Sequence, residues 1–235
     1  MTHSIIWTRA AEEWENDRDI FGQDLAQVVR LPCLRLQVLD AKWPSQGAED
    51  SSPERYVVCF TSQKAVEAVP KDVRPWLAQV KKVMTFGEQT QQALVRQGLP
   101  AVRLPASGGF EFSRILPTQL DPSDRVLICA AKYPAYPIAE DIRRAGFEVT
   151  QLALYSAESG VFSETGQDLD GKKLKELAEG LRGSICFASP SAVRGFVERL
   201  GERNPDLYKR LACGFYWRDK SGASAKVFCS CQDFP

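Results

Sequence analysis

The feature that most constrains the fold is a short phrase that occurs twice. CFTSQKAV spans residues 59–66, and CFASPSAV spans residues 186–193. In each copy an apolar run ends in Cys-Phe, meets a hydroxyl-bearing residue and continues into an Ala-Val pattern with helical spacing. This pattern is typical of a β-strand that runs into a capped helix. The repetition therefore favours two similar units in one chain.

Short β-like runs alternate with helical patterns along the chain. Strict alternation predicts βαβ units around parallel sheets, so the expected fold class is α/β, with two similar parallel-sheet domains of flavodoxin or Rossmann type. The expected strands are 4–8, 34–39, 56–60, 82–86, 101–104, 125–130, 147–155, 183–188 and 210–215. The expected helical segments are 65–80, 89–98, 110–120 and 137–146.

Two changes of composition indicate where the domains meet. Residues 41–55 are polar and rich in Ser, Pro and Gly, and a second shift falls at residues 156–171. If both are joints, the block between them forms one domain. The first ~40 residues must then pair with the last ~70 to form the other. This discontinuous arrangement predicts a cleft between two similar lobes.

Composition excludes several classes of partner. The chain has 235 residues, of which 44% are hydrophobic and 26% charged, and 30 basic residues balance 30 acidic ones. With this balance the chain has no large net charge that would attract nucleic acid or a membrane surface. The N-terminus has no basic segment followed by an apolar one, and no apolar run reaches ~18 residues. We expect a cytoplasmic protein.

Cysteine and histidine usage excludes some chemistries. Seven cysteines are present, five of them single residues in or beside apolar stretches, and no CxxC pair occurs. Reduced core thiols have this distribution. The only histidine is His3, so neither a histidine-based triad nor a histidine-ligated metal site is expected. Neither GxGxxG nor GxxxxGK[ST] occurs, which argues against nucleotide sites of those types.

Both copies of the repeated phrase place hydroxyls where a strand ends and a helix begins. These residues are Thr61 and Ser62 in the first copy, and Ser189 and Ser191 in the second. Free backbone N–H groups, the helix dipole and side-chain hydroxyls together favour an anion. For any one of these residues taken alone, simple N-capping is the favoured explanation. Duplication beside one expected cleft favours binding.

A third strand end and a charged residue add candidates. Gly87 and Thr90 follow the strand at 82–86 and precede a helix, and capping is again the alternative. Arg9 follows the first strand and is expected to face the same cleft, although an exposed arginine is ordinarily a solvated side chain.

Two further strand ends carry tyrosine. Tyr155 closes the strand at 147–155, where such a residue usually anchors a core with its hydroxyl at the rim. Lys132, Tyr133 and Tyr136 follow the strand at 125–130 in a loop stiffened by two prolines. This loop could serve a carboxylated ligand or be a plain structural turn.

Taken in order, these motifs resemble the uroporphyrinogen-III synthase family. The resemblance covers nearly the whole chain, and the order and spacing of its short motifs carry more weight than any single one. The matching residues are Thr8-Arg9, Leu31-Pro32, FTSxxAV from Phe60, FGExTxxAL from Phe86, RxxGFEVxxLxxY from Arg143 and FASPSAV from Phe187.

The resemblance implies two α/β domains joined by a two-stranded ladder at about residues 34–40 and 149–158. Residues 1–36 with 159–235 would form the discontinuous domain, and residues 41–153 the inserted one. It implies ring closure of hydroxymethylbilane with inversion of the last pyrrole ring and loss of water, without metal or cofactor. Tyr155 matches the tyrosine expected to assist departure of the hydroxyl. Expected substrate contacts are Arg9, Thr61, Ser62, Lys64, Gly87, Thr90, Lys132, Ser189 and Ser191.

The expected partner is this small-molecule substrate, with no nucleic acid and no membrane. The resemblance also implies a monomer in transient contact with the preceding enzyme of the pathway. Another class of function stays open, since a non-catalytic two-lobed protein that binds a tetrapyrrole or polycarboxylate would use the same anion-binding edges. We further expect Tyr155, Thr90 and Ser189 to line one cleft between the domains.

The sequence departs from the family in two places. The loop AAKYPAYP stands where the family usually has a glycine and an arginine. The second departure is the segment from Cys213 to Pro235. By analogy with the first copy of the repeat, a glycine, an acid, a threonine and a helix should follow here. The chain instead has FYWRDKSGASAKVFCSCQDFP after Gly214. With one permitted choice of codons, loss of a single T gives Gly-Phe-Ile-Gly-Glu-Thr-Lys-Ala-Ala-Leu, which echoes FGEQTQQAL. We therefore hypothesise a shifted reading frame near Phe215 and expect a poorly packed tail, an incomplete domain and weak activity.

Overall fold

The structure is a computed structural model that describes residues 4–22, 27–46, 52–187, 189–201, 204, 206–207, 211–218 and 224–230. His3 lies outside these residues. The chain divides into two compact units. Unit 1 combines Met1–Leu36 with Glu158–Pro235, and unit 2 is Gln37–Ala157. Among the described helices, none is long and apolar enough to cross a membrane.

Unit 2 is built on a sheet with the strand order β3-β8-β7-β4-β5-β6. From β8 to β6 every pair of neighbouring strands is parallel. Strands β3 and β8 are neighbours, and the boundary between the units falls within both. The bounds are β3 Leu34–Val38, β4 Tyr56–Phe60, β5 Lys82–Thr85, β6 Val102–Arg103, β7 Arg125–Ala131 and β8 Glu148–Ser159.

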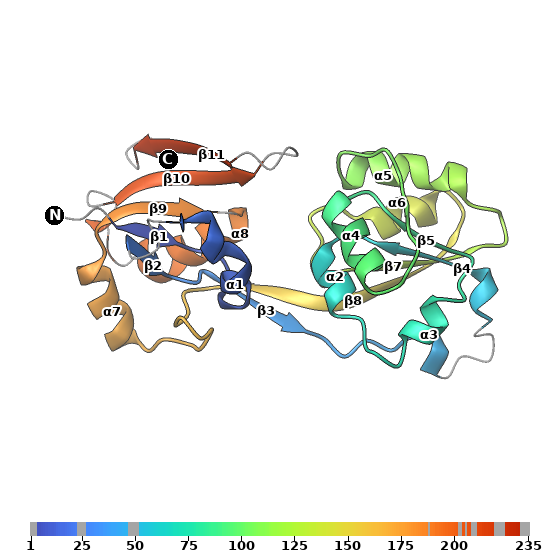
Figure 1. Cartoon of the computed structure of the whole chain (residues 1–235), viewed down its shortest axis with the longest axis horizontal. Helices are drawn as coiled ribbons and strands as arrows, with labels where there is room; N and C mark the ends of the chain where they lie inside the picture. Colours follow the sequence, from blue (N-terminus) through green and yellow to red (C-terminus); the bar gives the residue numbers. More distant parts are fainter. Residues whose placement is uncertain are drawn as a thin grey trace. The chain divides into compact units, whose positions relative to one another are not determined.

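Helices cover both faces of this sheet, as Figure 1 shows. Tyr56, Val58 and Phe60 of β4 pack with α2, α3 and α4, whereas Val57 and Cys59 pack with α5 and α6. A strand buried on both faces accounts for the continuous apolar run YVVCF. The helices are α2 Gln63–Glu67, α3 Arg74–Leu77, α4 Glu88–Arg96, α5 Gly109–Ile115 and α6 Ile138–Arg144.

The helical segment expected at 65–80 is not continuous. Helix α2 ends at Glu67 and α3 begins at Arg74. Pro70 lies between them, and Pro75 occupies the first turn of α3. Proline lacks the N–H that a helix interior requires but fits the first turn of a helix. The two prolines therefore divide the segment into two short helices.

Unit 1 contains a sheet with the strand order β11-β10-β9-β1-β2. Strands β2, β1, β9 and β10 are parallel, and β11 runs antiparallel to β10. The bounds are β1 Ile5–Trp7, β2 Val28–Arg30, β9 Gly183–Phe187, β10 Leu211–Arg218 and β11 Ser224–Ser230. Strand β2, which has only three residues, was not among the expected strands.

Helices α7 (Gly171–Gly180) and α8 (Pro190–Phe196) pack on one face of this sheet. On the other face lie Trp7, Phe21 and Cys186, beside the short helix α1 (Trp14–Asp17). Gly195 of α8 approaches the backbone closely, since a Cβ there would clash with the Gly160 nitrogen. Only glycine allows α8 this close to the backbone at Gly160.

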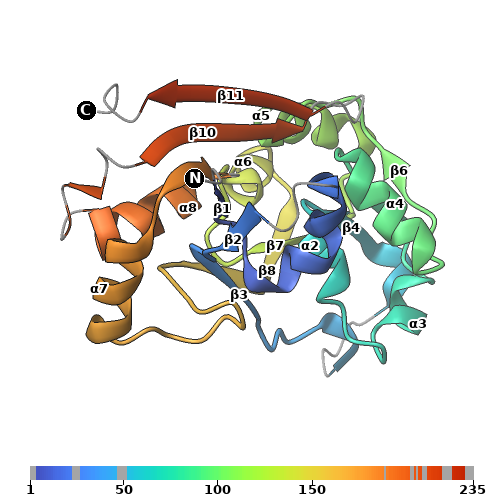
Figure 2. The ribbon, with the colours of Figure 1, turned by 60° about the vertical axis from the view of Figure 1, so that its left-hand side comes forward.

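The end of the chain differs from a βα unit. Strands β10 and β11 form an antiparallel pair from Ala212 opposite Ser230 to Arg218 opposite Ser224, and Figure 2 shows them side by side. A helix would follow β10 in a regular βα repeat. The backbone of the expected poorly packed tail is therefore paired as strands, with Leu211 buried at the start of β10. The rest of that expectation concerns side chains outside the described ones.

Candidate functional site

The carboxyl ends of parallel strands bring several predicted residues of unit 2 to one edge of its sheet. Thr61 and Ser62 follow β4, and Lys132 follows β7. These two strands are parallel neighbours in register from Tyr56 opposite Arg125 to Phe60 opposite Cys129. The Thr61 hydroxyl donates to the Cys129 carbonyl at 3.2 Å, which fixes it against β7. This edge is where ligands of open α/β sheets usually bind.

A pocket of about 320 Å³ opens at this edge, within unit 2. Its lining combines apolar walls with hydroxyl groups and one carboxamide. The lining residues are Thr61, Ser62, Phe86, Gly109, Ile128, Ala130, Ala131, Tyr133, Pro134, Ala135, Tyr136, Ile138, Gln151, Tyr155 and Ala157. Three predicted residues, Thr61, Ser62 and Tyr155, therefore share one pocket.

An irregularity in β8 sets the position of Tyr155. Ala130 of β7 pairs with Ala153, but Ala131 pairs with Tyr155, so Leu154 is an extra residue on β8. Bulges of this kind re-aim side chains and are common beside active sites. The Tyr155 carbonyl accepts the Lys132 amide N–H at 2.7 Å, which ties β8 to the loop after β7.

Tyr155 and Ser62 meet through their hydroxyl groups, which lie 3.1 Å apart. Ser62 is also the N-cap of α2, and its Oγ accepts the Ala65 amide N–H at 3.2 Å. The capping interpretation of Ser62 is therefore confirmed, and the contact with Tyr155 is made in addition to it. Both side chains are partly buried.

The loop of residues 132–137 forms one wall of the pocket and is held by Tyr136. Its hydroxyl donates to Asp141 Oδ2 at 2.6 Å, and Ser113 donates to the same oxygen at 2.9 Å. These two hydrogen bonds hold the pKa of Asp141 below its usual value. Hydrogen bonding to the Asp141 carboxylate also raises the pKa of Tyr136.

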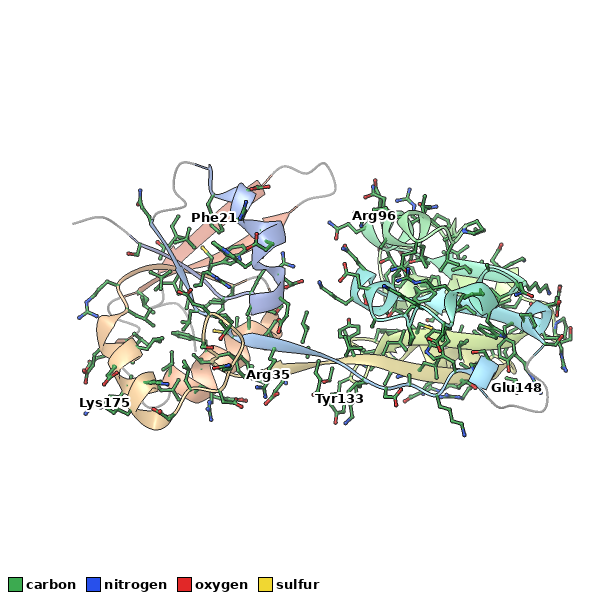
Figure 3. The ribbon with its side chains drawn as sticks, turned by 60° about the horizontal axis from the view of Figure 1, so that its bottom comes forward. Phe21, Arg35, Arg96, Tyr133, Glu148 and Lys175 are labelled. Atoms are coloured by element: carbon green, nitrogen blue, oxygen red, sulfur yellow. The ribbon has the colours of Figure 1, made fainter. Side chains whose placement is uncertain are left out.

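Tyr133 is the most exposed aromatic residue at this wall. Its side chain is 78% exposed and stands out from the ribbon in Figure 3. The Lys132 ammonium lies 5.5 Å from the centre of its ring, in a cation–π arrangement. Lys132 itself is not among the lining residues, although its neighbour Tyr133 is.

Other predicted residues of unit 2 lie outside this lining. Gly87 is the N-cap of α4, and Thr90 is 4% exposed, with its Oγ1 3.0 Å from where a Gly87 Cβ would stand. Lys64 pairs with Glu67 one turn further along α2, at 2.9 Å. The structure gives these three residues local structural contacts, and their role toward a substrate stays a prediction.

The predicted residues of unit 1 also have local partners. Ser189 caps α8 by accepting the Ala192 amide N–H at 3.2 Å, and Ser191 lies in the first turn of that helix. The Arg9 guanidinium pairs with Glu13 at 2.7 Å and with Asp17 at 2.9 Å. These carboxylates are alternatives to a substrate carboxylate as partners of Arg9.

The expected cleft shared by Tyr155, Thr90 and Ser189 stays a prediction, because the first two belong to unit 2 and Ser189 belongs to unit 1. Within unit 2, sequence reasoning missed Phe86 and Gln151 as site members, whereas it left the loop with Tyr133 and Tyr136 open between ligand binding and a structural turn. Position at a strand end would have identified Phe86. The prolines around Tyr136 were the available signal for a fixed loop.

Neither thiols nor a metal cluster add chemistry to the described part of the chain. Cys33, Cys59 and Cys129 are free thiols, and these three and Cys186 are buried. Burial raises the pKa of the first three thiols well above its usual value, so they are poor nucleophiles. No group of three or more metal-ligating side chains occurs among the described residues.

Comparison with known proteins decides the family. The sequence matches the family described as Uroporphyrinogen-III synthase HemD over residues 20–214, which is most of the chain. The chain belongs to the uroporphyrinogen-III synthase family. This family consists of enzymes of tetrapyrrole synthesis. The match ends at Gly214, beside the position at which we hypothesised a shifted reading frame.

Solved structures of the family share the fold. Uroporphyrinogen-III synthetase from Helicobacter pylori has 15% identity and a TM-score of 0.56, covering 84% of this chain and 78% of its own. A mutant uroporphyrinogen III synthase from the extremely thermophilic bacterium Thermus thermophilus has 12% identity and a TM-score of 0.56, covering 90% and 84%. The expected α/β fold class is confirmed. No curated protein sequence matched the chain.

Proposed function

We propose that this chain closes hydroxymethylbilane into uroporphyrinogen III, with inversion of the last pyrrole ring and loss of water, and is therefore a cyclising hydro-lyase. The family match over residues 20–214 supports the proposal. The observation in the structure that carries it is Tyr155, which lines a pocket at the carboxyl edge of a parallel sheet and has its hydroxyl 3.1 Å from that of Ser62, another lining residue. Ligands of such sheets bind at this edge.

The reaction needs a proton donor where the substrate hydroxyl leaves. Carbon–oxygen cleavage puts negative charge on the departing oxygen, and a phenol O–H supplies a proton to it. The electron-rich pyrrole stabilises the cationic carbon that remains. Tyr155 is the residue proposed for this step, since it lines the pocket while its backbone is held by the Lys132 amide.

Ring closure then depends mainly on orientation. Holding the two ends of a flexible chain in one geometry contributes up to several kcal/mol. A pocket of about 320 Å³ takes only part of a molecule with four pyrrole rings. The proposed remaining contacts are the hydroxyls, the glycine at a helix start and the cations named in the sequence: Arg9, Thr61, Ser62, Lys64, Gly87, Thr90, Lys132, Ser189 and Ser191.

The charge of the proposed substrate also suits the polar and cationic groups proposed to bind it. Hydroxymethylbilane carries eight carboxylates, which hydroxyls, backbone N–H groups and cations bind better than an apolar cavity does. Lys132 stands beside the pocket, its ammonium over the Tyr133 ring. We further propose that the chain works in the cytoplasm as a monomer without metal or cofactor, in transient contact with the enzyme that makes its substrate.

A non-catalytic protein that binds a tetrapyrrole or polycarboxylate is not favoured, because the family is one of enzymes. A coupled assay separates the two functions. Hydroxymethylbilane is generated in the presence of the chain, and the product isomers are separated after oxidation. We expect the type III isomer in proportion to the amount of chain. Formation of only the spontaneous type I isomer would falsify the proposed function.

A further inference from the structure

Ser62 has a hydroxyl proton that its capping role does not use. Its Oγ accepts the Ala65 N–H at 3.2 Å, which occupies a lone pair of the oxygen. The hydroxyl hydrogen stays free to rotate toward another acceptor. The Tyr155 oxygen, at 3.1 Å, is such an acceptor. Donation in this direction leaves the Tyr155 proton available to a ligand.

We infer that Ser62 is a positioning residue for Tyr155, donating to the phenol oxygen so that the Tyr155 O–H points into the pocket. The inference rests on the proposed function. Capping of α2 fixes the position of Ser62 Oγ, and the bulge at Leu154 fixes the position of Tyr155. Neither side chain needs to move for this arrangement to form.

The proposed step balances without a further reactant. The bond from the methylene carbon to its hydroxyl breaks, and both electrons leave with the oxygen. The oxygen takes the Tyr155 proton and departs as water, and the Ser62 O–H stabilises the phenolate that is left. When the ring closes, a pyrrole carbon loses one proton, which returns to the Tyr155 oxygen. The sum is loss of one water.

The internal repeat supplies a matched control for Ser62. Ser189 has nearly the same backbone angles, φ −159° and ψ 154° against φ −157° and ψ 156°, and caps its helix at the same 3.2 Å. Among the described residues, the only hydrogen-bond partner of the Ser189 hydroxyl is the Ala192 amide. Alanine at either position removes an N-cap, but only Ser62→Ala removes a contact with a phenol.

A double-mutant cycle measures the coupling. Steady-state formation of the type III isomer is compared for the wild type, Ser62→Ala, Tyr155→Phe and the double variant, and the same cycle is run with Ser189→Ala. Ser189→Ala removes a proposed substrate contact, so we expect its effect on kcat to be equal in the two backgrounds. We expect Ser62→Ala to lower kcat about fivefold to tenfold with a smaller change in KM. In the Tyr155→Phe background it should change kcat by less than about twofold. Ser62→Thr, which keeps the hydroxyl, should restore most of the loss.

A spectroscopic measurement tests the contact independently of activity. The Tyr155 Cζ resonance in protein labelled with ¹³C-tyrosine is assigned by its disappearance in Tyr155→Phe. It should shift in Ser62→Ala and stay unchanged in Ser189→Ala. An unchanged resonance in Ser62→Ala, or equal kcat losses in the two backgrounds, overturns the inference alone. A wild type that yields only type I isomer overturns the proposed function, and with it the catalytic role of Ser62.

Discussion

The Tyr136 hydroxyl donates a 2.6 Å hydrogen bond to the Asp141 carboxylate, which fastens the loop after β7 to helix α6. Tyr136→Phe keeps the ring against Gly109 but removes this bond. The loop wall should then be less well ordered, and the KM for hydroxymethylbilane should rise roughly threefold to fivefold with little change in kcat. Steady-state assays of the variant measure this. A lower kcat with unchanged KM contradicts a role in shaping the pocket.

The same hydrogen bonds predict a dependence on pH. Tyr136 and Ser113 hold the pKa of Asp141 below its usual value, so the ionised carboxylate is favoured in the folded state. Its contribution to stability is complete above the unfolded pKa of about 4 and disappears as pH falls through the lower folded value. The difference in thermal midpoint between wild type and Asp141→Ala should be constant near neutral pH and shrink below about pH 4. A difference that grows with acid contradicts the prediction.

Gly109 is required because Tyr136 packs directly against it. A Cβ on Gly109 would lie 2.9 Å from the Tyr136 Cβ, whereas a Cβ on Gly108 would meet nothing within 4 Å. Gly109→Ala should therefore destabilise the protein by about 1–3 kcal/mol and raise KM. Gly108→Ala, the matched control, should cost less than about 1 kcal/mol. Denaturant titrations of both variants test this, and equal losses would show that the contact with Tyr136 does not matter.

Replacing the tail after Gly214 with the sequence of the alternative reading frame should increase stability and activity. The family match ends at Gly214, and the described backbone beyond it forms the β10–β11 pair where a regular repeat would have a helix. A chain that continues from Gly214 as Phe-Ile-Gly-Glu-Thr-Lys-Ala-Ala-Leu-Arg-Gln-Lys-Phe-Ser-Val-Arg-Ala-Lys-Ile should have a higher thermal midpoint. It should also form type III isomer faster per molecule.

Resequencing the gene across the T-run near Phe215 tests the origin of the tail. An extra T relative to close relatives is the expected result. If the run stands as translated and the alternative frame stops early, the tail is native and the frameshift hypothesis is wrong.

The fold was predictable because the burial of these strands is visible in their pattern of apolar residues. YVVCF is apolar at every position since both of its faces are covered, and the hydroxyls after it lie where parallel strands end. The sequence contains no comparable sign of the register of β8. Nothing in FEVTQLALY distinguishes a regular strand from one with an extra residue at Leu154, although that residue decides where Tyr155 lies.

Contacts within short turns were equally hidden in the sequence. Arg9 pairs with carboxylates four and eight positions away because the turns after β1 bring Glu13 and Asp17 back toward it. The sequence shows an arginine near several acids but not this geometry. Pro70 and Pro75 were visible signals, and their effect on the helix expected at 65–80 was underestimated.

The most direct test of the account is the rate of type III formation by Tyr155→Phe, measured beside its thermal unfolding. The phenol hydroxyl is proposed to supply the proton for the leaving group, and its only hydrogen bond in the described structure is to Ser62. We expect kcat to fall about tenfold or more and the unfolding free energy to change by less than about 1 kcal/mol. An unaltered rate, with all product still the type III isomer, would contradict the assignment of the chemistry to this pocket.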